Sequence, residues 1–344
     1  MKNKNKIHLK FGKKSSDISK IKKNFLINNN SLLDSNLKIV EFLKKQSLRA
    51  TCKNCGLTLP KKIDCTSHNM AYKICINCTH LNSKFNDSQE FHDKIYHNEK
   101  FSYAKNYMQD YKLRVKNIYV PKVNFITEFL KKKKTKNVKI LDIGSGCGHF
   151  LKACHQKKIS ALGLESNLDM IKLGQKYLKK NSLVHSTSYE NSLKIIKDGK
   201  YTMISLISVI EHLERPNEIF NSFKKSKNKY LFLSIPLFNF SAFLENAFQN
   251  VYPRHMAATH PHLYTYESIK YILKRYKLKI CSEWWFGSDM IDLNRSLLVS
   301  FGKNKSSNFS KKFKESFSNQ IDELQDVLDR KKLSSEVHLI ISHN

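Results

Sequence analysis

The chain has 344 residues, of which 40% are hydrophobic, so it is long enough for one full-sized α/β domain and a smaller module. No apolar run approaches the roughly 18 residues of a membrane span, and the lysine-rich start of the chain lacks the apolar core of a secretory signal. These features predict a cytoplasmic protein. The formal net charge is +32, yet only seven of the 61 basic residues are arginine, the side chain preferred for bidentate recognition of phosphates and bases. Because the lysines are dispersed along the chain, the positive charge is better explained by a general bias in amino-acid composition than by a nucleic-acid-binding surface. Nucleic-acid binding is the less favoured alternative.

The first 49 residues are expected to form a basic arm, over 1–35, and a short amphipathic helix, over 38–48. A zinc ribbon is predicted over 50–82, because this segment contains two Cys-x-x-Cys pairs separated by 19 residues: Cys52, Cys55, Cys75 and Cys78. Four thiolates at this spacing are typical of a closed structural Zn²⁺ site. Reduced or redox-active thiols are the alternative.

Residues 83–136 are expected to connect the ribbon to the following domain. The segment is rich in Tyr, His and Asn and ends in a helix that begins near Pro121. Such a connector could close over a substrate, or it could simply pack between the two modules.

From residue 137 to the end, apolar strands alternate with amphipathic helices, which predicts an α/β fold with a mostly parallel sheet. The first five strands are expected near 138–142, 160–165, 182–186, 202–209 and 229–234. A long irregular stretch over 236–264 follows, and its length makes it a candidate substrate loop. A helix capped by Thr265, a strand near 278–286, a charged helix over 309–332 and a last antiparallel strand over 336–342 complete this domain.

A glycine-rich turn follows the first of these strands and is expected to bind a nucleotide-type cofactor. Gly144, Gly146 and Gly148 allow a tight turn and a close approach of backbone to ligand. Asp142 ends this strand and Glu165 ends the next one, where a carboxylate can accept hydrogen bonds from ribose hydroxyls. Dinucleotides and S-adenosylmethionine both fit this geometry. Asp142 favours the latter, which has no phosphate and carries two positive charges.

Three motifs in order resemble those of class I S-adenosylmethionine-dependent methyltransferases, over roughly residues 115–300. They are Leu-Asp-Ile-Gly-Ser-Gly-Cys-Gly at 141–148, Glu165 after the second strand, and Ile-Glu-His-Leu-x-x-Pro at 210–216. The resemblance implies a Rossmann-like seven-stranded sheet, S-adenosylmethionine as methyl donor, and a set of cofactor-binding residues: Asp142, Gly144, Ser145, Gly146, Glu165 and Ile207.

Histidines in the candidate substrate loop are the best catalytic candidates, because imidazole titrates near the working pH and can act as a general base. With the ribbon and the tyrosine-rich connector, the segment containing His260, His262 and Tyr264 looks like the zinc-containing sugar methyltransferases that act on nucleotide-linked deoxysugars. That resemblance implies active-site roles for His212 and His262, the latter as general base. We expect His260 and Tyr264, in the same loop, to be secondary contacts. The family's acidic residue between the two loop histidines is Pro261 here, so O-methylation of a nucleotide-linked or surface-glycan sugar is as plausible as C-methylation.

Two other functions stay open. A zinc ribbon, a methyltransferase domain and basic charge also resemble ribosomal RNA base methyltransferases, although the fourth strand is followed by Ser-Val-Ile-Glu at 208–211 and not by the Asn-Pro-Pro-aromatic motif for amino groups. The second open function is that of a scaffold protein without catalytic activity, which keeps the cofactor fold and uses the ribbon for protein contacts.

Overall fold

The computed structural model describes residues 7–19, 21, 26–96, 108, 110–179, 181–186, 188–301 and 308–344. The beginning of the expected basic arm (1–6) and the tyrosine-rich centre of the expected connector (97–107) lie outside the described residues.

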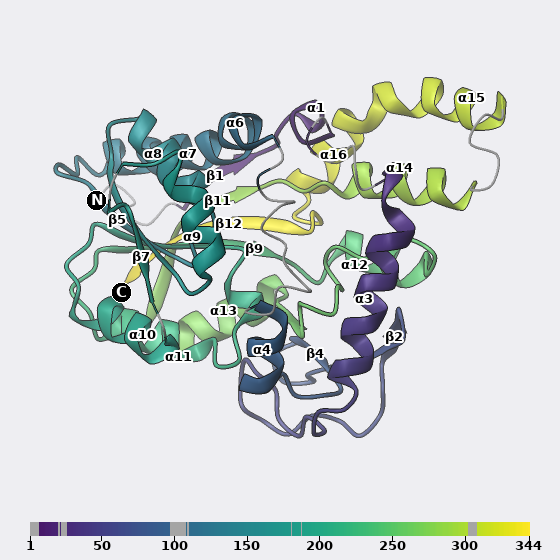
Figure 1. Ribbon diagram of the computed structural model, residues 1–344, viewed down its shortest axis with the longest axis horizontal. Coiled ribbons are helices and arrows are strands. Elements are labelled where there is room, and N and C mark those ends of the chain that lie inside the picture. Colours follow the sequence, from purple (N-terminus) through teal and green to yellow (C-terminus); the bar gives the residue numbers. More distant parts are fainter. Residues whose placement is uncertain are drawn as a thin grey trace, which may run out of the picture.

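A central sheet of eight strands organises the catalytic part of the chain (Figure 1), in the order β1-β11-β12-β9-β8-β5-β6-β7. Within it, β12 is antiparallel to both β9 and β11, and the other described pairs are parallel. The strands are β1 (His8–Phe11), β5 (Lys139–Ile143), β6 (Ser160–Glu165), β7 (Leu183–His185), β8 (Met203–Ile207), β9 (Tyr230–Pro236), β11 (Leu278–Trp285) and β12 (Glu336–His343). The predicted Rossmann-like fold is confirmed, with seven of these strands where the sequence placed them.

The eighth strand, β1, corrects the expectation that residues 1–35 are an arm throughout. Its four residues pair in parallel with β11, and the indole Nε1 of Trp284 donates a hydrogen bond to the carbonyl of Gly12 at 3.0 Å. An exposed sheet edge presents unpaired backbone groups, and β1 satisfies those of β11. A short helix, α1 (Ser15–Ser19), follows.

Helices cover both faces of the sheet (Figure 1). On one face, α7 (Val120–Lys132) and α8 (His149–Gln156) contribute Val123, Phe129 and Phe150 to a buried cluster. A short helix α6 (Tyr111–Arg114) and a π-helical turn over Val115–Tyr119 lead directly into α7. The other face packs against α10 (Tyr189–Asp198), α11 (Asn217–Lys224) and α13 (Tyr266–Arg275), while α9 (Leu168–Gln175) lies beside β6 and β7.

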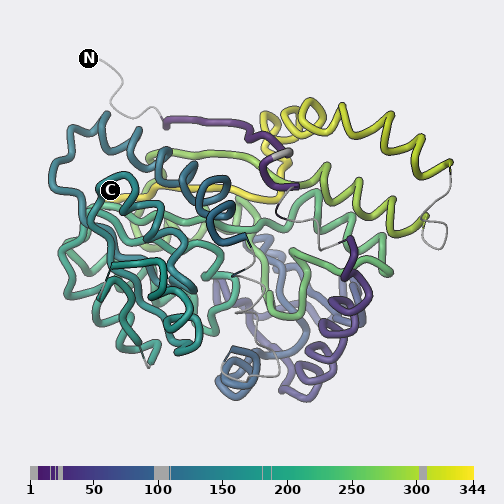
Figure 2. Tube along the Cα trace, turned by 45° about the horizontal axis from the view of Figure 1, so that its top comes forward, coloured from purple at the N-terminus to yellow at the C-terminus, as the bar shows by residue number. Residues whose placement is uncertain are grey.

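The cysteine-containing module is built on an antiparallel sheet of four strands in the order β10-β4-β3-β2. The strands are β2 (Cys65–Ser67), β3 (Met70–Ile74), β4 (Leu81–Ser83) and β10 (His262–Leu263), flanked by α3 (Asn29–Leu43) and α4 (Gln89–Tyr96). The helix predicted over 38–48 therefore begins nine residues earlier and ends at Leu43. Figure 2 shows this module, in purple and blue, beside the green segment that follows β9.

The stretch 236–264 is irregular only in part, because 248–261 has neither helix nor strand but the segments on either side do. It contains α12 (Phe240–Ala247) and ends in β10, which pairs antiparallel with β4 of the cysteine-containing module. The candidate substrate loop is thus attached to a sheet far away in sequence. This pairing fixes the position of His262, which lies on β10 opposite Asn82 of β4.

The C-terminal part adds α14 (Asp289–Ser300), α15 (Asn308–Phe317) and α16 (Ile321–Arg330) before β12. The helix predicted over 309–332 is broken by a 3₁₀ turn at Ser318–Gln320. Among the described residues, no helix combines the length and apolar character needed to cross a membrane.

Candidate active site

The glycine-rich turn after β5 requires glycine for two separate reasons. Gly144 and Gly146 have φ values of +66° and +53°, which L-side chains adopt only with strain. A Cβ on Gly144 would lie 2.8 Å from a methyl carbon of Val209, whereas a Cβ on Gly146 would meet no atom within 4 Å. The turn therefore packs tightly against the segment after β8 and leaves open space beside Gly146, which suits a ligand that approaches the backbone.

Glu165, at the end of β6, is held across this turn by backbone amides. Its Oε2 accepts a hydrogen bond from the N–H of Gly146 at 2.7 Å, and its Oε1 accepts from the N–H groups of Ser166 and Asn167 at 2.9 Å. A carboxylate offers about four acceptor positions. One remains on Oε2, so the carboxylate can accept one ribose hydroxyl without losing a backbone partner.

Asp142 is buried, with 3% of its surface exposed, and its Oδ1 accepts a hydrogen bond from Ser205 Oγ at 2.6 Å. Burial raises the pKa of this carboxyl to about 7, although the hydrogen bonds from Ser205 and Ser145 act in the opposite direction. Ser145 ties the turn to β6, because its backbone N–H donates to the carbonyl of Leu164 at 3.0 Å. Ile207 ends β8, the strand next to β5. The candidate cofactor residues therefore converge on one end of three adjacent strands.

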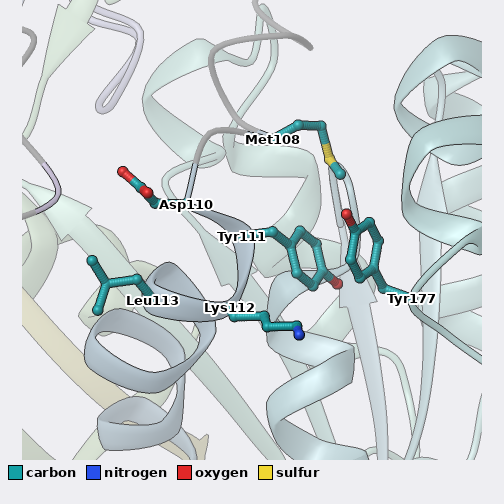
Figure 3. A pocket seen from close by; sticks show the side chains of 6 residues that line it. All are labelled: Met108, Asp110, Tyr111, Lys112, Leu113 and Tyr177. Carbon is teal, nitrogen blue, oxygen red and sulfur yellow. The ribbon is translucent and has the colours of Figure 1, made fainter.

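An aromatic pocket of about 350 Å³ lies beside the glycine-rich turn, lined by Met108, Asp110, Tyr111, Lys112, Leu113 and Tyr177. The rings of Tyr111 and Tyr177 face each other in Figure 3, with centroids 4.0 Å apart. The hydroxyl of Tyr111 donates to the carbonyls of Cys147 and Gly148 at 3.4 Å. Sequence reasoning missed this pocket. The tyrosine-rich composition of the connector was its only signal.

The four predicted metal ligands meet at one buried point. The Sγ atoms of Cys52, Cys55, Cys75 and Cys78 all lie within 4.8 Å of one another, with 3.7 Å between Cys52 and Cys78 and 3.5 Å between Cys55 and Cys75. These distances exceed the roughly 2.05 Å of a disulfide. They approach the ~3.8 Å that metal–sulfur bonds of about 2.3 Å impose on a tetrahedron. The donor set and its geometry fit one four-coordinate metal ion.

Local backbone geometry explains how the two cysteine pairs form. The N–H of Gly56 donates to the carbonyl of Cys52, and the N–H of Thr79 donates to that of Cys75, each at 2.8 Å. Gly56 and Thr79 both have positive φ, +79° and +60°. The side-chain amide of Asn54 also donates to Cys78 Sγ at 3.5 Å, which supports a negatively charged sulfur.

His262 lies on β10, opposite Asn82 of β4, and is fully buried. Its Nδ1 lies 2.9 Å from Nε2 of His80, a residue that follows the fourth cysteine by two positions. Tyr264 packs against both rings, with centroids 4.6 Å from His80 and 5.5 Å from His262. Sequence reasoning gave His80 no part in the active site, because the pairing of β10 with β4 has no local signal.

The hydrogen bonds around His80 determine which nitrogen of His262 is basic. Ser268 Oγ lies 2.9 Å from the carbonyl of Thr265 and 3.3 Å from His80 Nδ1; with its single proton directed to the nearer carbonyl, it accepts a hydrogen bond from His80 Nδ1. His80 Nε2 then carries a lone pair and accepts a proton from His262 Nδ1. The lone pair of His262 is left on Nε2, an atom with no hydrogen-bond partner among the described residues. Burial lowers the pKa of His262 well below its usual value, so the imidazole is neutral in the free protein.

His212 and His260 form a second pair, with ring centroids 4.5 Å apart. Nδ1 of His212 donates to the carbonyl of Thr259 at 2.8 Å and also lies 2.8 Å from the hydroxyl of Tyr96, while Nδ1 of His260 donates to the carbonyl of His255 at 2.8 Å. Burial lowers the pKa of His212 to about 4 and that of His260 well below its usual value, so both rings are neutral at pH 7.

Glu211 lies beside this pair and was not among the predicted site residues. Its side chain is fully buried, and no other described residue donates a hydrogen bond to either carboxylate oxygen. Burial raises its pKa to about 8. The short 3₁₀ turn Ile210–His212, which contains Glu211, contacts β10, the strand that carries His262. The four histidine and tyrosine side chains predicted from sequence therefore lie in one polar region with His80 and Glu211. His212 and His260 are half-buried, and the other side chains of this region are fully buried.

Residues 111–283, about half of the chain, match the protein family described as a methyltransferase domain. The chain belongs to this family. It is an S-adenosylmethionine-dependent methyltransferase, as the order of its motifs indicated. No curated protein matches its sequence.

Similar folds occur among solved structures, all at low identity. An S-adenosylmethionine-dependent methyltransferase from Archaeoglobus fulgidus is 23% identical, with 64% of this chain and 94% of that chain covered and a TM-score of 0.39. Magnesium protoporphyrin IX methyltransferase from Synechocystis is 12% identical, with coverages of 68% and 88% and a TM-score of 0.41. The plantazolicin methyltransferase BamL is 14% identical, with coverages of 73% and 94% and a TM-score of 0.47. Similarities this distant identify no acceptor.

Proposed function

We propose that the methyltransferase acts on a hydroxyl group of a small acceptor, a nucleotide-linked or surface-glycan sugar. The observation that carries this proposal is the orientation of His262. Its Nδ1 lies 2.9 Å from His80, and its Nε2 is buried with no partner among the described residues; in the tautomer that donates Nδ1–H to His80, Nε2 carries the lone pair that deprotonation of a hydroxyl requires.

The cofactor would lie at the turn after β5. When bound, S-adenosylmethionine supplies an activated methyl group on a positively charged sulfur. Glu165 Oε2 would accept a ribose hydroxyl, and ionised Asp142 would stabilise the positive charge. Gly146 would leave room for the ligand, Gly144 and Ser145 would fix the turn against its neighbours, and Ile207 would form an apolar wall at the end of β8.

His262 would remove the hydroxyl proton through Nε2. The resulting imidazolium keeps donating its Nδ1–H to His80, so the new charge retains a hydrogen-bond acceptor inside a buried region. His80 is a positioning residue, because it sets the tautomer and ring orientation of His262. We place His212, His260 and Tyr264 along the acceptor side of the same region.

The four cysteines are proposed to hold a structural Zn²⁺, since a closed tetrahedral thiolate site leaves no position for a substrate. The metal would stabilise the turn that carries His80. It would also hold Lys53, whose ammonium donates to the carbonyl of Leu213 at 2.7 Å, next to His212. Along the sequence we propose a ribbon over 50–82, a connector over 83–136 and a catalytic domain over 137–344, with β1 added to the sheet of the catalytic domain and β10 to that of the ribbon.

The acceptor class can be tested with isotopically labelled S-adenosylmethionine and three substrate sets: nucleotide sugars, free oligosaccharides and RNA. We expect a mass gain of one methyl group on a sugar, with turnover greatly reduced in His262→Gln. The matched control is His185→Gln, an exposed histidine on β7. Labelling confined to RNA would replace this proposal by RNA base methylation, the alternative that the charge of +32 favours.

A further inference from the structure

Three side chains near the end of β8 have the arrangement of a metal site separate from the four cysteines. One carboxylate oxygen of Glu211, one ring nitrogen of His212 and one ring nitrogen of His260 all lie within 4.8 Å of one another. An ion with bonds of about 2.0–2.2 Å can bridge such a group after a small adjustment of the side chains.

The two histidines are already oriented as metal ligands are. Each donates Nδ1–H to a backbone carbonyl, His212 to Thr259 and His260 to His255, both at 2.8 Å. Because a carbonyl can only accept, each ring carries its proton on Nδ1 and its lone pair on Nε2. Hydrogen bonding of the second ring nitrogen to a carbonyl is the usual way in which proteins orient metal-bound histidines.

Glu211 supplies an independent observation. The carboxyl group is completely buried, and within the described part of the chain no other residue donates to either of its oxygens. A buried carboxyl group without partners is costly, and a cation bound to it removes that cost. His212 and His260 are only half-buried, so an ion could enter from their side.

We infer that Glu211, His212 and His260 bind a divalent transition-metal ion. Two imidazoles and one carboxylate favour Zn²⁺, Fe²⁺ or Co²⁺ over Mg²⁺ and Ca²⁺, which prefer oxygen ligands. Three protein ligands leave at least one coordination position open, unlike the four-cysteine site. The inference concerns metal binding alone and does not depend on the identity of the methyl acceptor.

The first test is metal content. The purified full-length protein is saturated with Zn²⁺, freed of unbound metal and measured by mass spectrometry of the elements. We expect two zinc ions per chain in the wild type and in the control His185→Gln, and one in Glu211→Gln and in His260→Gln. One zinc ion per chain in the wild type would overturn the inference, as would two in both variants.

A second measurement needs no variant, so a folding defect cannot obscure the answer. Wild-type protein with zinc already bound to its cysteines is titrated with Co²⁺ and followed by absorption. We expect saturation at one equivalent with weak d–d bands and no thiolate-to-cobalt charge-transfer band, as befits nitrogen and oxygen ligands. The absence of saturable binding, or a strong charge-transfer band, would show that this second site does not exist.

Discussion

Asp142 gives the sharpest expectation, because burial places its pKa at about 7, where a small change in pH changes its charge. The usual value for an aspartate is about 3.9. In the free protein the neutral form thus prevails below pH 7. A bound sulfonium and ammonium would favour the ionised form. We therefore expect affinity for S-adenosylmethionine to increase as the pH rises through 7.

The size of the effect follows from the ionised fraction. With a pKa of about 7, roughly one tenth of the Asp142 side chains are ionised at pH 6 and roughly nine tenths at pH 8. If binding requires the ionised form, the dissociation constant should fall about tenfold over this range, equivalent to about 1.4 kcal/mol. The stability of the free protein changes in the opposite sense. A carboxyl with a raised pKa stabilises the fold below pH ~4 and loses that contribution as the pH rises through 7.

The assay is calorimetric titration of S-adenosylmethionine into wild type and Asp142→Asn at pH 6, 7 and 8. The amino group of the ligand also titrates, near pH 8, but it does so equally for both proteins. The ratio of their dissociation constants therefore isolates Asp142. An exposed carboxylate on α9, tested as Asp169→Asn, serves as the control and should keep the wild-type profile. A ratio that stays constant from pH 6 to pH 8 would refute the argument that Asp142 faces the cofactor's charge.

Other expectations test the remaining parts of the site. Because a Cβ at Gly144 meets Val209 and Glu165 offers the ribose acceptor, Gly144→Val and Glu165→Ala should each weaken binding of S-adenosylmethionine in calorimetry; unchanged affinity in both would remove the assignment of the cofactor site. Cys75→Ser should lose the metal of the four-cysteine site and lower the melting temperature, and full metal content with full stability would contradict a structural role. His262→Gln should reduce turnover by about 10²–10⁴-fold with cofactor affinity near wild type, whereas a mere packing residue would lower stability and cofactor binding together. If the lysine content is compositional, RNA binding should be weak and should disappear as salt is raised in a filter-binding assay; tight, sequence-dependent binding at physiological salt would favour an RNA substrate.

The parallel core of the fold could be predicted because its signals are local. Buried parallel strands are short apolar runs, and 139–143 and 203–207 each end where glycine or polar residues begin. Helix starts were equally readable where a side chain caps them. The hydroxyl of Thr265 accepts a hydrogen bond from the N–H of Ser268, as expected of a cap.

Elements that depend on distant partners could not be predicted in this way. β1 has four residues within a lysine-rich segment, and it is a strand because β11 offers an unpaired edge. β10 has only two residues, and it exists because β4 lies beside it. The break at 318–320 likewise has no glycine or proline to signal it.

In the candidate site, too, residues in local motifs could be predicted and residues that depend on tertiary contacts could not. The glycine-rich turn, Glu165 and His212 follow recognisable motifs, so their positions could be expected from sequence. His80 and Tyr111 could not, because each joins the site through a tertiary contact: His80 through Nδ1 of His262, and Tyr111 through the carbonyls after the glycine turn. The role of His80 is visible only after the hydrogen-bond chain from Ser268 is followed.

The claim that His262 deprotonates a sugar hydroxyl is tested most directly by locating the transferred methyl group. The product formed from S-adenosylmethionine with a carbon-13-labelled methyl group is purified and examined by nuclear magnetic resonance. We predict that the label appears as a methyl group bonded to a sugar oxygen. A label bonded to carbon, or to a ring nitrogen of an RNA base, would contradict the proposed reaction.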